Sequence, residues 1–491
     1  MSTRVGLADR IFLLQESSDS PQHVAALGTF ELPPDATPDY LKRLVASYRS
    51  ARTFAPPFNY RLRSPALKAV APGFVELPDD EVDLDFHFRH SALPPPGGER
   101  ELGVLVSRLH SRPLDLDRPL WEVHLIEGLS PVRFALYFKV HHALMDGVGG
   151  SRRLQQMLSP DPTDTEVRPM WSIGPNRPSA AHDATNAHDA TDAPVAGHSL
   201  VGRLGSVAGG VREGVETMGG LGLAAGGLIK NGVWPSEDAI ATPYKVPSSP
   251  LNGRIGHQRR VATQAIDFDR AREVADRARV TINDVFLAIC SGGLRRYLKE
   301  MDALPKTSLV AGTPVSVRVG DGDSSNNAFT IALMKIYTDI PDPVQRIRAI
   351  HRSSTVAKES LNGLSKPVAE NYGALFMTPF ILQGLVGLGG RLKPPYNLII
   401  SNVPGPLETQ YLAGARLEAM YPIALLAHGM ALFIASLAVS GKMGLGFTGD
   451  RERLPHLQRL AVYTGEAVGE LEDALASTPV RRRRSSNKPK G

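Results

Sequence analysis

The sequence predicts an α/β protein of two domains joined by a long irregular linker. Segments with the period of strands alternate with segments with the period of helices in both halves of the chain. A chain of 491 residues, 42% hydrophobic and 21% charged, is long enough to bury two or three cores. Order is lost between about residues 160 and 250, where the sequence is rich in Ala, Gly and Pro. We therefore predict domains at 1–160 and 256–478, a flexible and partly helical linker at 161–255, and a disordered basic tail at 479–491.

The first domain begins with a strand over residues 22–32 and a helix over 40–48, which a Thr-Pro-Asp cap precedes. Alternation of apolar and polar residues predicts a strand over 82–88, and a helix follows over 99–109. Residues 121–125 alternate in the same way. A turn over residues 128–131 then leads to a second long β segment, and we expect the two segments to pair.

That second segment, residues 133–142, places one histidine on an apolar face. Successive side chains of a strand alternate between faces, so His142 continues the face of Phe134, Leu136, Phe138 and Val140, and the other face carries Arg133, Tyr137, Lys139 and His141. Partial desolvation favours the neutral imidazole, and a neutral imidazole with a reference pKa of about 6.5 is suited to general-base catalysis near neutral pH. We predict His142 as the catalytic base.

The segment ends in the turn His141-His142-Ala143-Leu144-Met145-Asp146-Gly147. The Asp146 carboxylate can hold its surroundings in place within this tight turn. Adjacent strand residues cannot both bind one ion, and the spacing to Asp146 matches no zinc pattern, so we expect no metal. The alternative is a core histidine followed by an ordinary turn. The doublet, the turn and the strand together favour catalysis.

In the second domain the pattern predicts a strand over 258–267, then helices over 268–278 and from 282 onward. Thr281 and Asp284 have the spacing of a capping box, which places Asn283 and Asp284 at a helix N-terminus. A strand over 309–317 ends in Arg318. A further strand over 397–402 enters the rigid turn Val403-Pro404-Gly405-Pro406, which can aim Ser401 or Asn402 at a ligand.

These motifs resemble a known family. HHxxxDG at residues 141–147 is the signature of CoA-dependent acyltransferases and of nonribosomal peptide condensation domains, and its flanks resemble the bacterial wax ester synthase/diacylglycerol acyltransferase family. The resemblance extends from about residue 7 to about residue 469. The matching segments are Asp83-Leu84-Asp85-Phe86-His87-Phe88-Arg89-His90, Pro119-Leu120-Trp121-Glu122, Asn283-Asp284-Val285, Pro314-Val315-Ser316-Val317-Arg318 and Ser401-Asn402-Val403-Pro404-Gly405-Pro406.

The resemblance implies two chloramphenicol-acetyltransferase-like α/β domains with His142 in a tunnel between them. Acyl-CoA would enter from one side as co-substrate, with no bound cofactor, and a lipid alcohol from the other. The implied reaction is O-acyl transfer of a long-chain acyl group to diacylglycerol, giving triacylglycerol, or to a long-chain alcohol, giving a wax ester. Gly147 would keep the passage open, Arg318 would pair with Asp146, and Asn283 and Asp284 would shape the entrance.

The sequence favours direct transfer over an acyl-enzyme. It contains no GxSxG elbow and no P-loop, and Cys290 lies in mid-helix without an evident activator. His142 would then take the proton of the acceptor hydroxyl, while Asn402, Ser401 or Asn283 stabilises the oxyanion. Residues 444–449 fit GxGxxG, but the acidic ribose partner and the βαβ context of a dinucleotide site are not evident.

Composition excludes other classes. The net charge of +5 arises from a tail with four Arg and two Lys, so nucleic-acid binding by the folded part is not implied. One cysteine and no leader-like opening predict a cytoplasmic protein. The apolar stretches at 372–390 and 423–439 are too interrupted to span a membrane, and peripheral contact with a membrane or lipid inclusions stays open. The alternative from a different class is a non-catalytic lipid-surface protein with structural histidines.

Overall fold

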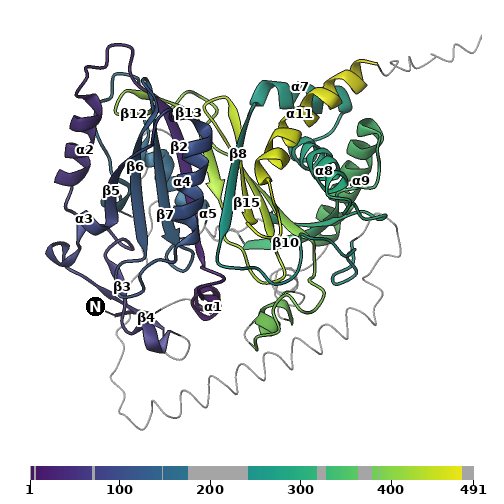
Figure 1. The fold of residues 1–491 in the computed structure, drawn as a ribbon, viewed down its shortest axis with the longest axis horizontal. Coiled ribbons are helices and arrows are strands. Elements are labelled where there is room, and N and C mark those ends of the chain that lie inside the picture. The colour runs from purple at the N-terminus through teal and green to yellow at the C-terminus, as the bar shows by residue number, and fades with distance from the viewer. Residues whose placement is uncertain are drawn as a thin grey trace, which may run out of the picture.

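Two six-stranded sheets stand side by side in the molecule, with helices packed against them (Figure 1). The structure is a computed structural model. It describes residues 2–4, 7–68, 72–145, 147–174, 241–317, 328–362, 377, 379–384 and 386–477.

The first sheet has the strand order β12-β13-β2-β7-β6-β5. At its centre, β7 (Arg133–His141) lies antiparallel between β2 (His23–Glu31) and β6 (Trp121–Ser130), and β5 (Phe88–Ala92) pairs parallel with β6. This confirms the predicted first strand and the pairing of the two long segments. The predicted helices are also confirmed, as α2 (Tyr40–Ser50) and α4 (Glu99–Ser111).

The prediction of a strand over 82–88 is wrong. Asp83 accepts a hydrogen bond from the Phe86 N–H at 3.2 Å and so starts a short helix, α3 (Leu84–His87). Strand β5 begins only at Phe88. The alternating pattern was compatible with a strand, but a side-chain cap offers the backbone a competing local hydrogen bond.

The two faces of β7 enter two different cores, as the alternation predicts. Phe134, Leu136, Phe138 and Val140 pack with α2 side chains such as Tyr48 and Leu44. Ala135 and Tyr137 face the other way, toward Leu102 and Val106 of α4. Both faces of β7 are therefore buried, and α4 covers the more polar one.

The second sheet has the strand order β10-β9-β11-β14-β15-β8. Strands β9, β11 and β14 are mutually parallel, and the remaining pairs are antiparallel. Its strands are β8 (Arg259–Asp267), β9 (Val310–Val317), β10 (Ala328–Lys335), β11 (Leu398–Val403), β14 (Leu432–Val439) and β15 (Lys442–Asp450). Helices α7 (Phe268–Ala278), α8 (Ile282–Glu300), α9 (Pro343–Asn362) and α11 (Leu457–Ala476) enclose the largest core with it. The predicted strands and helices of this half are confirmed.

One segment of the second half joins the first sheet. Strands β12 (Tyr411–Leu412) and β13 (Ala415–Ile423) extend it, with β13 antiparallel to β2. A division of the chain into 1–160 and 256–478 does not include this exchange. At the same junction, a Cβ on Gly446 would lie 1.8 Å from the Pro422 carbonyl oxygen, and one on Gly444 would lie 2.2 Å from that of Met420. The glycines that fit GxGxxG thus let β13 cross close to β15.

The edge of the second sheet is closed by the first domain. Ser107 and Ser111 lie one turn apart on α4, and their hydroxyl oxygens accept the backbone N–H groups of Val261 (2.9 Å) and Arg259 (2.8 Å) on β8. Figure 1 shows α4 beside β8, the strand of the second sheet that lies nearest the first sheet. Edge strands with free N–H groups invite pairing with other chains, so the two serines satisfy this one. Among the described residues, no helix is both long and apolar enough to cross a membrane.

Candidate active site

His142 lies directly beyond the end of β7, where the chain leaves the sheet. Its backbone N–H donates to the Gln22 carbonyl at 2.8 Å, which prolongs the pairing of β7 with β2 by one bond. Its half-buried imidazole stacks on the ring of Phe12, with 4.0 Å between ring centroids and 25° between planes. Phe12 belongs to α1 (Leu7–Gln15), which lies at the lower end of the molecule in Figure 1. The predicted partial desolvation of His142 thus has a defined source.

His141 is buried on the opposite side of the chain. Its Nδ1 accepts the Ala143 N–H at 3.1 Å, and its Nε2 lies 3.4 Å from Oε2 of Glu16. Because Nδ1 is an acceptor, Nε2 carries the ring proton on the side that faces the Glu16 carboxylate. His141 is thus a buried residue that holds the turn, whereas the half-buried ring of His142 is the more accessible of the two.

Buried polar side chains that bond to one another and to backbone carbonyls lie on the same face of β7 as His141. Lys139 is fully buried, and its Nζ donates to the carbonyls of Leu109 (3.2 Å) and Arg112 (3.1 Å) and pairs with Glu122 at 3.2 Å. Burial lowers the pKa of His110 to about 3, and burial likewise holds the pKa of His23 well below its usual range. These histidines are neutral, hydrogen-bonded parts of the fold.

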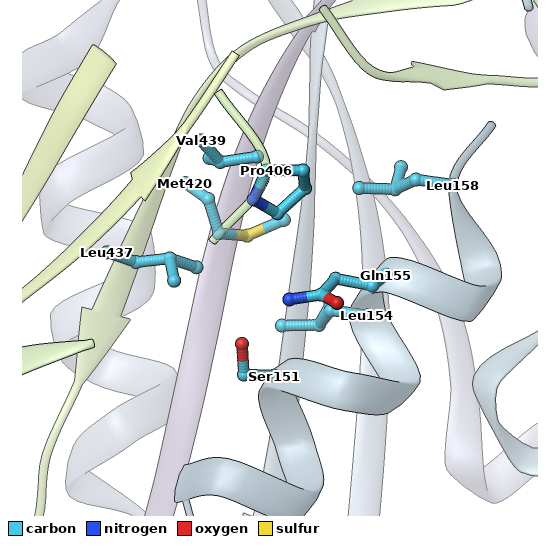
Figure 2. A pocket seen from close by; sticks show the side chains of 8 residues that line it. All are labelled: Ser151, Leu154, Gln155, Leu158, Pro406, Met420, Leu437 and Val439. Carbon is cyan, nitrogen blue, oxygen red and sulfur yellow. The ribbon is translucent and has the colours of Figure 1, made fainter. Parts of the chain in front are cut away.

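The turn after His142 leads into α5 (Gly147–Met157). A Cβ built on Gly147 meets no heavy atom within 4 Å, so this position is open. Further along, α5 faces the second domain across a small, mostly apolar pocket with a volume of ≈ 10 Å³. Figure 2 shows its lining: Ser151, Leu154, Gln155, Leu158, Pro406, Met420, Leu437 and Val439.

The structure separates the two candidates on β11. Asn402 is level with Ser436 of β14, and the Ser436 hydroxyl donates to its Oδ1 at 2.7 Å. Ser401 is level with Ala435 and so points to the opposite face. Leu437 shares that face and lines the pocket beside α5. Ser401 therefore faces the pocket side of the sheet, whereas Asn402 has its amide oriented by Ser436.

Asp284 is bonded to residues of two helices. It forms the predicted capping box with Thr281 and also bonds the hydroxyl of Ser354 and Nδ1 of His351 (2.8 Å), both on α9. Burial acts to raise its pKa, but these hydrogen bonds outweigh burial and lower it. The carboxylate is fully buried. Its contacts tie α8 to α9, and the half-buried Asn283 beside it is the more accessible of the pair.

Two family models match this chain. The model described as the wax ester synthase/diacylglycerol acyltransferase catalytic domain matches residues 6–286, and the WS/DGAT C-terminal domain matches residues 325–472. The chain belongs to this family. The family assignment, the fold class and the enzyme class predicted from the sequence are confirmed.

Similar proteins support the assignment over nearly the whole length. A Mycobacterium tuberculosis protein named as a diacylglycerol O-acyltransferase is 40% identical, covering 96% of this chain and 97% of its own. The O-acyltransferase WSD of Acinetobacter baylyi is 34% identical, covering 95% and 96%. The solved wax ester synthase/diacylglycerol acyltransferase of Marinobacter aquaeolei has a TM-score of 0.74 at 33% identity, covering 96% and 100%. A condensation domain of the calcium-dependent antibiotic synthetase, 15% identical with a TM-score of 0.51, shares the fold alone.

Several predicted features fall on residues outside the described ranges. Asp146 and Arg318 lie outside the described residues, so their ion pair stays a prediction, as do the structures expected for residues 175–240 and for the basic tail. Cys290 is buried, and burial raises the pKa of its thiol, as expected for a packing residue. Within the described ranges, no group of three or more His, Cys, Asp or Glu side chains is arranged to hold a metal ion.

Two residues beside the histidines were not predicted from the sequence. Phe12 belongs to helix α1, which was not predicted, and Glu16 directly follows that helix. Their four-residue spacing on an amphipathic segment was a usable signal, because such residues share a helix face. Nothing in the pattern, however, distinguished Glu16 from the exposed acids of the chain.

Proposed function

We propose that this protein transfers a long-chain acyl group from acyl-CoA to diacylglycerol, forming triacylglycerol and free CoA. The observation that carries the proposal is the placement of His142. Its imidazole leaves the sheet at the start of the turn into α5, is held against Phe12, and is only half buried. The relatives named as diacylglycerol O-acyltransferases support diacylglycerol as the acceptor.

The transfer is direct. His142 removes the proton of the acceptor hydroxyl as the oxygen attacks the thioester carbonyl, giving a tetrahedral oxyanion. The intermediate collapses by breaking the carbon–sulfur bond, and the imidazolium returns the proton to the CoA thiolate. The thiol of Cys290 is buried, and the sequence contains no GxSxG serine, so neither provides an activated nucleophile for a covalent route.

Stabilisation of the oxyanion requires a hydrogen-bond donor at the reacting carbonyl. Ser401, Asn402 and Asn283 are the candidates from the second domain. Asn402 accepts from Ser436 through Oδ1, which turns its NH₂ group away from Ser436 as a preset donor. Ser401 instead shares a sheet face with Leu437 at the pocket. The two residues thus suit different tasks, Asn402 as an oriented donor and Ser401 as part of the passage wall.

The pocket beside α5 suits an apolar part of a substrate. Most of its lining is aliphatic or thioether, and it lies where α5, from Ser151 onward, faces β13 and β14 (Figure 2). Its small volume means that side chains such as Met420 must move to admit an acyl chain. Methionine suits that, since its unbranched side chain repacks readily.

A long-chain alcohol is the alternative acceptor, which would make the product a wax ester. The likeness to the wax ester synthase/diacylglycerol acyltransferase of Marinobacter aquaeolei supports it. Peripheral contact with a membrane or lipid inclusions would deliver either acceptor. The proposed general-base step is the same for both, because each presents a hydroxyl group.

The test measures free thiol released from palmitoyl-CoA by purified protein, with diacylglycerol, hexadecanol or no acceptor. We expect acceptor-dependent release with wild type, loss of at least about 100-fold in His142→Ala, and unchanged release in His257→Ala, a control at an exposed histidine. Retained release in His142→Ala, or no release with either acceptor, would overturn the mechanism and favour a lipid-surface protein. Preference for hexadecanol would overturn only the assignment of diacylglycerol.

A further inference from the structure

Helix α1 and the residue after it contact both histidines of the doublet. Phe12 stacks on the ring of His142, and the Glu16 carboxylate lies 3.4 Å from Nε2 of His141. Phe12 and Glu16 are four residues apart, so they lie on the same side of this segment. A single short segment from the N-terminal end of the chain thus contacts both His141 and His142.

Glu16 also connects to His142 through the backbone of Gln22. Its Oε2 accepts the Gln22 N–H at 2.5 Å, and the carbonyl of the same residue accepts the His142 N–H at 2.8 Å. Gln22 is fully buried. Displacement of Gln22 would therefore move the backbone of the catalytic histidine directly.

The stretch between Glu16 and Gln22 is held by the second domain. Arg259 of β8 donates to the Asp19 carbonyl at 2.6 Å, and the Ser20 hydroxyl donates to the Leu426 carbonyl at 2.9 Å. In each contact a side chain donates to a main-chain carbonyl, and the two segments joined are more than 200 residues apart in the chain. The position of His142 is thus tied to the packing of the two domains.

The contacts of Glu16 are buried, so their geometry is tightly restricted. The side chains of Glu16 and His141 are 5% and 1% exposed. A carboxylate in such surroundings is costly unless hydrogen-bonded, so the geometry that satisfies it is strongly preferred over nearby alternatives. The carbonyl of Glu16 is bonded separately by Nζ of Lys68 at 2.7 Å, which a change of the Glu16 side chain leaves in place.

We infer that Glu16 is a positioning residue for acyl transfer. Through His141 and Gln22 it fixes the backbone that carries His142, while Phe12 fixes the plane of the imidazole. It touches no reacting atom. The inference rests on the proposed function, in which His142 is the general base. Small misplacements of a catalytic group cost rate far more than binding, so its loss should appear in kcat and not in KM.

The experiment compares Glu16→Ala, Glu16→Gln and Glu16→Asp in steady-state transfer from palmitoyl-CoA. Glu16→Ala should lower kcat by about 10- to 100-fold, with KM for palmitoyl-CoA within about twofold of wild type. Glu16→Gln keeps an oxygen for the Gln22 N–H and should recover part of kcat, whereas the shorter Glu16→Asp should recover less.

Leu13→Ala is the matched control. Leu13 is fully buried on the same helix and belongs to an apolar cluster. It should lower the unfolding temperature more than Glu16→Ala does, with a smaller loss of kcat. A kcat within twofold of wild type in Glu16→Ala, or equal kcat losses in Leu13→Ala and Glu16→Ala, would overturn the inference. If His142→Ala still turns over, the proposed function itself fails, and the two failures are thereby distinguished.

Discussion

Lys139 shows how a charged residue can lie in the centre of a sheet. It is directly opposite Glu122 on the neighbouring strand, and two carbonyls at the C-terminal end of α4 accept its remaining protons. Burial lowers the pKa of Lys139 and the Glu122 charge opposes that effect. For Glu122, burial acts to raise the pKa, but the contacts with His124 and Lys139 outweigh it and lower the value to about 2.

We expect Lys139→Met to destabilise the protein by about 3–5 kcal/mol, because the Glu122 carboxylate is then buried without its cation. The double variant Lys139→Met/Glu122→Gln should recover much of this loss, since no charge is left unpaired. Urea unfolding measures both. A double variant as unstable as the single one would contradict the pairing argument.

The same pair predicts a pH dependence with a definite sign. Because the folded pKa of Glu122 lies below its usual value of 4.5, its contribution is complete above about pH 4.5 and is lost as the pH falls toward 2. Glu122→Gln should show a shallower fall of stability across that window than wild type.

At the scale of elements, the capping box of α8 links two helices. Thr281 and Asp284 close the helix N-terminus, and the same carboxylate accepts from His351 and Ser354 of α9. We expect Asp284→Ala to cost about 2–4 kcal/mol, one part for the cap and another for the stranded partners on α9. Thr281→Ala removes the cap alone and should cost about 1 kcal/mol. Equal costs in chemical unfolding would show that the α9 contacts contribute nothing.

The capping box also illustrates what local sequence can specify. Thr281 and Asp284 lie three residues apart, so their interaction follows from helix geometry and was predictable. Lys139 was assigned to the right face of its strand by alternation, but its burial depends on α4, which covers that face. Local periodicity gives the direction of a side chain and not what lies opposite it.

The parts of the fold and of the site that the sequence did not predict depend on contacts between segments distant in the chain. The join of β13 to β2 and the approach of α1 to the histidines both pair segments that carry no mutual signal in their own periodicity. The catalytic motif was recognisable because its residues are contiguous. Phe12 and Glu16 were not, since their role exists only once the chain has folded back on residues 141–143.

At the scale of the molecule, the two domains are joined where β13 crosses β15. The Gly446 position faces the Pro422 carbonyl oxygen at a distance no Cβ can adopt, so Gly446→Ala must push the strands apart. We expect a loss of about 3 kcal/mol or more in unfolding free energy, because a backbone atom cannot yield as a side chain would. The shift should also reduce acyl transfer, since His142 and the β11 candidates lie on opposite domains. Gly469→Ala on α11 is the control: a Cβ there meets no atom within 4 Å, and it should stabilise the helix by up to about 1 kcal/mol. Wild-type stability and turnover in Gly446→Ala would show that the close crossing of β13 and β15 does not hold the domains in register.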